Sequence, residues 1–158
     1  MADPTQPATV ERVADAAPAP GPAKTPVVSA RTKARKAALD ILFQADLLNT
    51  SVLDVLGDAV DLGETAVRPY TDELVRDVAA RREEIDALIA ANLPDGWTLA
   101  RMPRVDRNLA RVAVSEITAH RVGVGVAISE AVALAGDLST DESPAFLGGV
   151  LSAVAKTV

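Results

Sequence analysis

The most continuous helical pattern of hydrophobic positions in the chain lies between Pro103 and Ala119. At about 100° per residue, its apolar side chains cover well over half of the circumference, which leaves only a narrow polar stripe. The apolar positions are Val105, Leu109, Ala110, Val112, Ala113, Val114 and Ile117, and the stripe holds Arg107, Asn108, Arg111, Ser115 and Thr118. So wide an apolar arc predicts a central helix with neighbours on several sides. Asp106 and Glu116 fall inside the arc, so each is expected to have a polar partner.

A second strong pattern follows Ser29, a suitable N-cap residue, and predicts a helix over residues 30–49. Its predicted buried face consists of Ala34, Ala38, Ile41, Leu42, Ala45 and Leu48. Phe43 points almost opposite to this face, flanked by Leu39, Leu47 and Lys36. Two interpretations stay open. Either a second layer of helices covers these side chains, or they form a partner surface on which the Phe43 ring stacks on an RNA base.

The rest of the pattern predicts four or five further helices and no strand. Ser51 caps a short helix over 52–60, and residues 70–93 form one long helix or two helices joined near Arg81. Pro94-Asp95-Gly96 predicts a turn, after which Trp97 is expected to pack over the bundle. Two more helices are predicted over 124–138 and after the loop at 139–144, the last with Leu147, Val150, Leu151 and Val154 inward. Gly148-Gly149 inside that helix predicts a close approach of another helix or of a partner backbone.

Composition divides the 158 residues into a tail and one domain. Residues 1–28 hold most of the ten prolines and show no periodicity, which predicts a disordered tail; residues 29–158 form the predicted helical domain. Because aromatic residues make up only 3% of the chain, the core is expected to consist of Ala, Val, Leu and Ile. No run of 18 apolar residues and no signal pattern is present, so we expect a cytoplasmic protein without a membrane partner.

The net charge of −6 argues against a protein that coats nucleic acid by charge alone, but cations cluster locally. No acidic residue lies between Asp15 and Asp40. That interval contains Lys24, Arg31, Lys33, Arg35 and Lys36, and a second cluster contains Arg101, Arg104, Arg107 and Arg111. The sequence therefore predicts two basic patches on an acidic body, although ordinary solvated charge remains an alternative, above all for the second.

The residue types needed for catalysis or metal binding are scarce. The chain has no cysteine, its one histidine is His120, and its glycines do not form a phosphate-binding loop. We therefore expect no catalytic residue, no metal site, no cofactor and no enzymatic activity.

Three segments together resemble the NusB family of bacterial transcription antitermination factors. They are ARTKARKAALDILFQADL (30–47), VDRNLARVAVSEI (105–117) and VAISEAVALAGDLSTDESPAFLGGVL (126–151). The resemblance implies an all-α fold of about seven helices in two packed three-helix bundles. It also implies a factor that pairs with NusE, a ribosomal protein of the small subunit. The pair binds single-stranded boxA RNA, acts with the RNA polymerase elongation complex, and supports transcription of rRNA operons and maturation of rRNA.

The same resemblance implies which residues form the interfaces. The implied RNA-binding residues are Arg31, Lys33, Arg35, Lys36, Phe43, Glu142, Ser143 and Phe146. Leu39, Leu47 and Asp106 are the expected partner-binding residues. The chain departs from the family pattern at Gly148, Ser129 and Ser115, where relatives usually have Asn, Asn and Tyr.

We therefore expect a non-enzymatic RNA-binding adaptor. The alternative is a structural helical adaptor that associates with itself through Leu39, Phe43 and Leu47 and has no role in RNA binding; a homodimer is left open under either interpretation.

Overall fold

The structure is a computed structural model that describes residues 28–63 and 67–158. In these ranges the chain forms seven α-helices and one short 3-10 helix, and it contains no strand. The helices are α1 (Ala30–Leu48), α2 (Val52–Asp61), α3 (Pro69–Ala80), α4 (Arg82–Ala91), η2 (Leu99–Arg101), α5 (Arg104–Thr118), α6 (Val124–Leu138) and α7 (Ser143–Ala155). The predicted tail falls, apart from Val28, outside the described residues, and so does Lys24 of the first basic cluster.

The residues that end each helix explain the helix boundaries. The Ser29 hydroxyl accepts a hydrogen bond from the Thr32 N–H, and Ser51 does the same for Asp54, as the sequence predicts. Asn49 ends α1 in the left-handed conformation at φ 53°. The predicted segment 70–93 is two helices, since the chain turns at Arg81, whose guanidinium donates back to Asp77.

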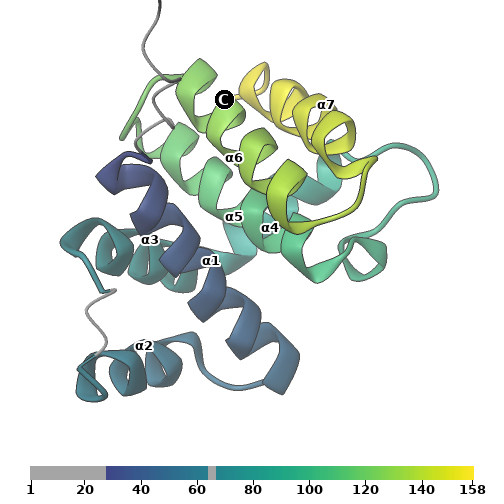
Figure 1. Cartoon of the computed structure of the whole chain (residues 1–158). Coiled ribbons are helices and arrows are strands. Elements are labelled where there is room, and N and C mark those ends of the chain that lie inside the picture. Colours follow the sequence, from purple (N-terminus) through teal and green to yellow (C-terminus); the bar gives the residue numbers. More distant parts are fainter. Residues whose placement is uncertain (1–27, 64–66) are drawn as a thin grey trace, which may run out of the picture.

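Helix α5 lies at the centre of the molecule, as its wide apolar arc predicts (Figure 1). Helices α1, α2 and α3 pack on one another as one bundle, and α5, α6 and α7 form the second. Helix α4 packs against α5 and α7, while α5 also contacts α1 and α3 and so joins the two bundles. The prediction of an all-α fold of two packed bundles is confirmed.

The core consists mainly of Leu, Val, Ile and Ala, as the low aromatic content predicts. Two assignments on α1 were wrong. Leu48 is 57% exposed because it is the last residue of the helix, at the corner before α2. Leu39 is only 2% exposed, because α5 and α6 approach that side of α1 and place Val105 and Leu138 around it.

The polar stripe of α5 does not face solvent. Asn108, Arg111 and Ser115 are buried, and each donates a hydrogen bond to a carboxylate on a neighbouring helix. The two acids in the apolar arc also have the expected partners, since Glu116 accepts from Arg35 and Asp106 accepts from Ser143. Polar bonds thus join α5 to four other helices and fix its rotation.

The two glycines of α7 differ in their surroundings. A Cβ at Gly148 would lie 3.7 Å from Val132 Cγ2, an ordinary contact with α6, whereas a Cβ at Gly149 would meet nothing within 4 Å. The predicted close helix approach is therefore wrong for Gly149. No helix in the described ranges is both long and apolar enough to cross a membrane.

Candidate nucleic-acid interface

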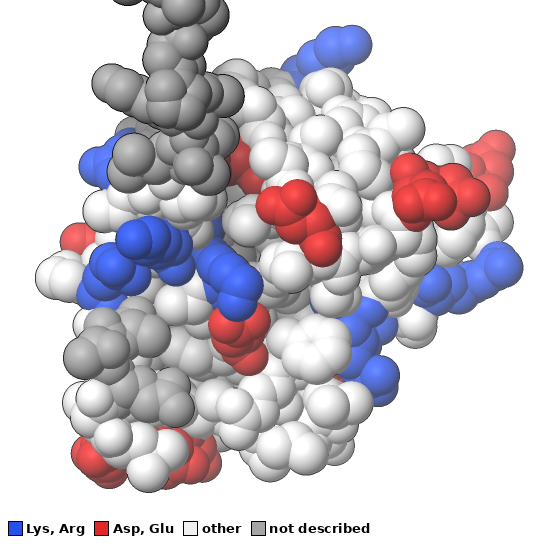
Figure 2. Space-filling model, viewed as in Figure 1, with Lys and Arg blue, Asp and Glu red and all other residues white. Residues whose placement is uncertain are grey.

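The first half of α1 carries three exposed cationic side chains, those of Arg31, Lys33 and Lys36. Figure 2 shows that Lys and Arg side chains gather over this part of α1, on the left of the view. Lys36 Nζ lies 3.3 Å from Asp40 Oδ2, one turn further on. Within the described residues, Arg31 and Lys33 form no ion pair with a carboxylate, so their charge is available to an anionic ligand.

Arg35 does not lie on this surface, although the sequence groups it with the other cations. Its side chain is 3% exposed, and its Nε and Nη2 donate to the two carboxylate oxygens of Glu116 at 2.9 and 2.8 Å. Nη1 lies 3.5 Å from Glu130. Burial alone would lower the pKa of Arg35, but the hydrogen bond and charge of Glu116, with the charge of Glu130, raise it. Arg35 is thus a fixed internal cation, and the expectation that it faces a phosphate is corrected.

Tyr70 connects the buried pair to the exposed cations, a role that sequence analysis missed. Its hydroxyl donates to Glu116, and the guanidinium of Arg31 lies 4.9 Å from the centre of its ring. Burial, together with the hydrogen bond and charge of Glu116, raises the pKa of Tyr70 to about 12. On the other side of α1, the Thr32 hydroxyl donates to Glu130 of α6 at 2.8 Å. The first turns of α1 are therefore held against both α3 and α6.

Phe43 lies further along α1, beside a hollow that separates α1 from the ends of α5 and α6. The ring is partly buried, and with Leu39, Asp40, Val105 and Leu138 it lines a space of about 180 Å³. Phe43 and Lys36 are seven residues apart, nearly two full turns, so they share one side of the helix. The structure thus combines the two interpretations of this face: other helices cover Leu39, whereas Phe43 stays accessible and Leu47 is 51% exposed.

Two of the four arginines of the second basic cluster are paired with carboxylates inside the protein. Arg107 donates to both carboxylate oxygens of Asp46, at 2.7 and 2.8 Å, and Arg111 does the same to Asp86, at 2.8 and 3.2 Å. The Arg107 hydrogen bond is the main cause that lowers the pKa of Asp46 to about 2, against the opposing effect of burial. Arg101 and Arg104 remain exposed. They belong to the segment entering α5, near which Figure 2 shows cationic side chains, on the right of the view.

The start of α7 brings three predicted site residues together but exposes only part of the set. Glu142 is exposed and Phe146 is partly buried, whereas Ser143 is 2% exposed. The Ser143 hydroxyl donates to Asp106 at 2.7 Å, and Ser139 donates to the other Asp106 oxygen at 2.6 Å. Asp106 is 2% exposed, so neither it nor Leu39 offers a surface to a partner, and both expectations are corrected.

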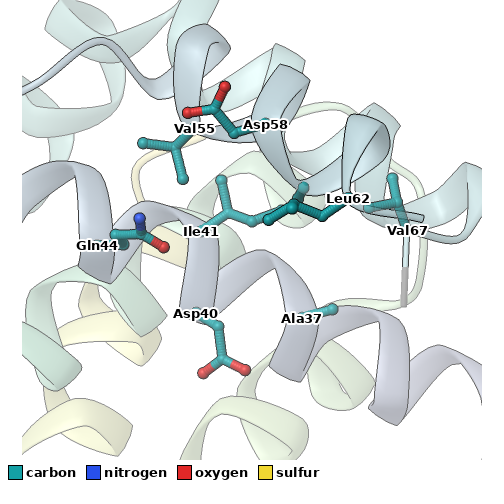
Figure 3. A pocket seen from close by; sticks show the side chains of 9 residues that line it. Ala37, Asp40, Ile41, Gln44, Val55, Asp58, Leu62 and Val67 are labelled. Carbon is teal, nitrogen blue, oxygen red and sulfur yellow. The ribbon is translucent and has the colours of Figure 1, made fainter. Parts of the chain in front are cut away.

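A separate cavity of about 140 Å³ lies between α1 and α2. Figure 3 shows its apolar lining, with Ile41 from one helix and Val55 from the other. Its two carboxylates, Asp40 and Asp58, point away from one another. Because no cation lines this cavity, it does not suit a phosphate, and we do not assign it to the interface.

The geometry therefore offers three exposed cations on the first half of α1, a partly exposed aromatic ring further along the same helix, and two exposed cations at the entry to α5. Such a surface suits a flexible polyanion with planar groups, since cations neutralise phosphates and rings stack on unpaired bases. Within the described residues, no three His, Cys, Asp or Glu side chains gather as metal ligands.

Comparison with known proteins adds the family context. The family model described as "NusB family" matches residues 32–156. A transcription antitermination protein NusB from Cutibacterium acnes is 49% identical over 127 residues, which are 80% of this chain and 49% of that protein. The chain thus spans about half the length of this relative. The corresponding protein of Acidothermus cellulolyticus is 51% identical over 79% of this chain and 86% of its own length.

Solved structures show the same fold. NusB of T. maritima superposes with a TM-score of 0.71 at 28% identity, covering 82% of this chain and 93% of that one. A chain from a crystal structure of the antitermination factors NusB and NusE in complex with double-stranded RNA superposes with a TM-score of 0.70 at 26% identity. The superposition covers 82% of this chain and 98% of that chain.

Proposed function

The chain belongs to the NusB family of non-enzymatic transcription antitermination factors, and from this premise we propose that it binds single-stranded boxA-type RNA together with NusE. In this proposal the complex acts in the cytoplasm on the RNA polymerase elongation complex. There it supports transcription of rRNA operons and maturation of rRNA.

The observation that carries the RNA part is the arrangement on α1. Arg31, Lys33 and Lys36 line its first half, and Phe43 follows one to two turns later. The cations bind the phosphate backbone, and the ring stacks on a base that pairing does not hold. Because stacking needs an unpaired base, the aromatic ring favours a single strand over a duplex.

Net charge is the reason for expecting a second protein in the complex. With an overall charge of −6 and with Arg35, Arg107 and Arg111 engaged internally, few cations remain for RNA. Affinity of the chain alone is therefore expected to be modest, and a basic partner adds phosphate contacts. The crystal structure of NusB and NusE in complex with double-stranded RNA, one chain of which has a fold similar to this chain, supports NusE as this partner.

Fluorescence anisotropy with a labelled boxA-type RNA tests the proposal. Affinity is measured with and without NusE across a series of salt concentrations. We expect NusE to tighten binding, and each phosphate contact to contribute about −0.7 to the slope of log K against log salt concentration. No binding at any salt concentration, or no effect of NusE, contradicts the proposal.

Two variants separate the roles of charge and stacking. Lys33→Ala should weaken binding and flatten the slope by about 0.7, because one phosphate contact is lost. Phe43→Ala should weaken binding by about 1–3 kcal/mol, roughly 5- to 150-fold, with the slope unchanged. Arg82→Ala on α4, which removes an Arg paired with Asp86, is the matched control and should leave the affinity unchanged. Equal losses of RNA affinity in all three variants would show a general effect of charge or folding and would contradict separate roles for Lys33 and Phe43.

Exposed leucines at the corner between α1 and α2 favour a second candidate function, self-association. Leu47, Leu48 and Leu53 are 51%, 57% and 47% exposed. A homodimer formed through this corner would have no need of RNA. Sedimentation at several concentrations, with and without RNA, distinguishes the two, since only self-association depends on protein concentration in the absence of RNA.

A further inference from the structure

The cavity of about 140 Å³ between α1 and α2 belongs to a surface groove with an apolar centre, which we call the α1–α2 groove. Ile41 and Val55 are buried at its centre, and Ala37 and Ala59 are partly exposed around them. Leu62, just after α2, lines the same groove and is 75% exposed. Apolar side chains gathered at one exposed place, unlike scattered ones, mark a surface on which another molecule docks.

Carboxylates flank this apolar centre on two sides. Figure 3 shows Asp40 of α1 and Asp58 of α2 on opposite rims, with Ile41 and Leu62 between them. Asp40 pairs with Lys36 on the surface, at 3.3 Å, an exposed pair that holds its partners only weakly. The groove therefore offers a negative charge on either side of an apolar centre.

Helix α2 adds to this negative charge. Asp54, Asp58 and Asp61 follow one another at steps of four and three residues, so they share one face of the helix, and α2 contains no Lys or Arg. The ion pairs of the described ranges all use other carboxylates. Because α2 lies at the edge of the molecule, packed on α1 and α3, this face stays open to a partner (Figure 1).

The volume of the cavity limits what can enter it. A dry cavity of about 150 Å³ holds one benzene molecule, so the 140 Å³ here accept one Leu, Met or Phe side chain. Sites for small organic ligands are larger, at roughly 300–1,000 Å³. A protein segment with one apolar anchor, and with Lys or Arg on both sides of that anchor, therefore matches both the volume and the charge of the groove.

Charge disfavours the other occupants. RNA phosphates would be repelled by the carboxylates of Asp40, Asp54, Asp58 and Asp61. A second copy docked groove to groove would place the same four carboxylates opposite one another. Residues 1–28 of this chain contain three acidic and two basic side chains, so they carry no excess of cations. A cationic segment of a different protein is the occupant that the charges favour.

We propose that the α1–α2 groove binds a short cationic segment of another protein, with one Leu, Met or Phe side chain in the cavity and Lys or Arg side chains beside Asp40 and Asp58. This surface is additional to the RNA interface, because neither Phe43 nor the exposed cations of α1 line the groove. Only Asp40 is shared with the hollow beside Phe43. Asp58 is therefore the acidic residue whose substitution tests the groove by itself.

The probe is a seven-residue peptide with Phe at its centre, two Lys on each side and Gly at both ends. It is titrated into the isotope-labelled full chain at low salt while amide chemical shifts are recorded. We expect shifts at Ala37, Ile41 and Val55, and none at the start of α7. Ser in place of the central Phe should weaken binding at least about tenfold, because the burial of the ring is lost. Glu in place of the four Lys should abolish binding.

Variants of the groove separate the cavity from the rim. Ala37→Leu fills the cavity with another good helix former, so it should weaken the Phe peptide at least about tenfold and leave the Ser peptide unchanged. Asp58→Asn should weaken the Phe peptide about two- to fivefold. Asp137→Asn is the matched control, since it removes an exposed aspartate of α6 outside the groove and should leave the affinity unchanged. Urea midpoints confirm that each variant is folded.

Several outcomes would overturn the proposal. Equal affinity for the Phe and Ser peptides, or equal losses in Asp58→Asn and Asp137→Asn, would show a general attraction of cations to an acidic protein. Shifts of the groove amides when the concentration of the chain alone is raised would assign the groove to a second copy. Displacement of the peptide by boxA-type RNA would assign it to RNA, whereas the proposal predicts that the chain binds both at once.

Discussion

The buried ion pair between α1 and α5 offers a sharp test of how the cationic first half of α1 is held in place. Glu116 is 1% exposed and accepts from Arg35 through two guanidinium nitrogens and from the Tyr70 hydroxyl. The substitution Glu116→Gln keeps the size of the side chain and removes its charge. It therefore leaves the cation of Arg35 buried with only the more distant Glu130, whose oxygen lies 3.5 Å away.

The expected loss of stability follows from those contacts. Each hydrogen bond to a charged group is worth about 1 kcal/mol more than the bond to a neutral group. Three such bonds are weakened, so the free energy of unfolding should fall by about 3 kcal/mol, near the lower end of the roughly 3–5 kcal/mol expected when one partner of a buried pair is removed. With an m-value of about 2 kcal/mol/M, the urea midpoint should fall by about 1.5 M.

Urea denaturation followed by circular dichroism measures this loss. The matched control is Glu84→Gln, because Glu84 is 59% exposed and pairs with Arg81 at 3.4 Å on the surface; the expected loss there is about 0.5 kcal/mol or less. The triple variant Arg35→Met, Glu116→Leu, Tyr70→Phe should recover most of the stability, because no charge stays buried without a partner. A loss below about 1 kcal/mol in Glu116→Gln, or no recovery in the triple variant, would refute this reasoning.

Two further predictions concern stability. Asp46→Asn should reduce stability at neutral pH and remove part of the pH dependence, since the pKa of Asp46 is lowered from 3.8 to about 2. The lowered pKa stabilises the folded chain by roughly 2 kcal/mol above about pH 5, and this stabilisation is lost as the pH falls through about 4 towards 2. Urea midpoints of the unchanged chain and of Asp46→Asn at pH 7, 4 and 2.5 measure the loss. An equal fall of the midpoint with pH in the two proteins would contradict the prediction. Gly149→Ala should stabilise the chain by about 0.5–1 kcal/mol, because a Cβ there meets nothing and alanine favours the helix; a lower thermal midpoint would contradict this.

Sequence periodicity was sufficient for the helices because each pattern is local. The central position of α5, the caps at Ser29 and Ser51 and the inward face of α7 all follow from residues within a few turns of one another. Leu39 and Leu48 were misassigned because their burial depends on whether helices distant in the sequence cover each position: α5 and α6 cover Leu39 in the middle of α1, whereas Leu48 at its end stays exposed.

The candidate site was predicted less completely, because ion pairs join residues far apart in the chain. Arg107 and Asp46 are 61 positions apart, and Arg35 and Glu116 are 81 apart. Counting cations along the chain therefore could not tell Arg31, Lys33 and Lys36, which face solvent, from Arg35, which is buried. One signal was present: Glu116 lies in the apolar arc of α5 and required a partner, yet nothing local identified that partner as Arg35.

Mapping amide chemical shifts of the isotope-labelled chain on addition of boxA-type RNA tests the central claim most directly. We predict that the perturbed amides cluster in the first half of α1, around Phe43 and at the start of α5, while those of α2 stay unchanged. Perturbations centred on α2 or α4, or none at RNA concentrations that saturate binding, would contradict an RNA interface on α1.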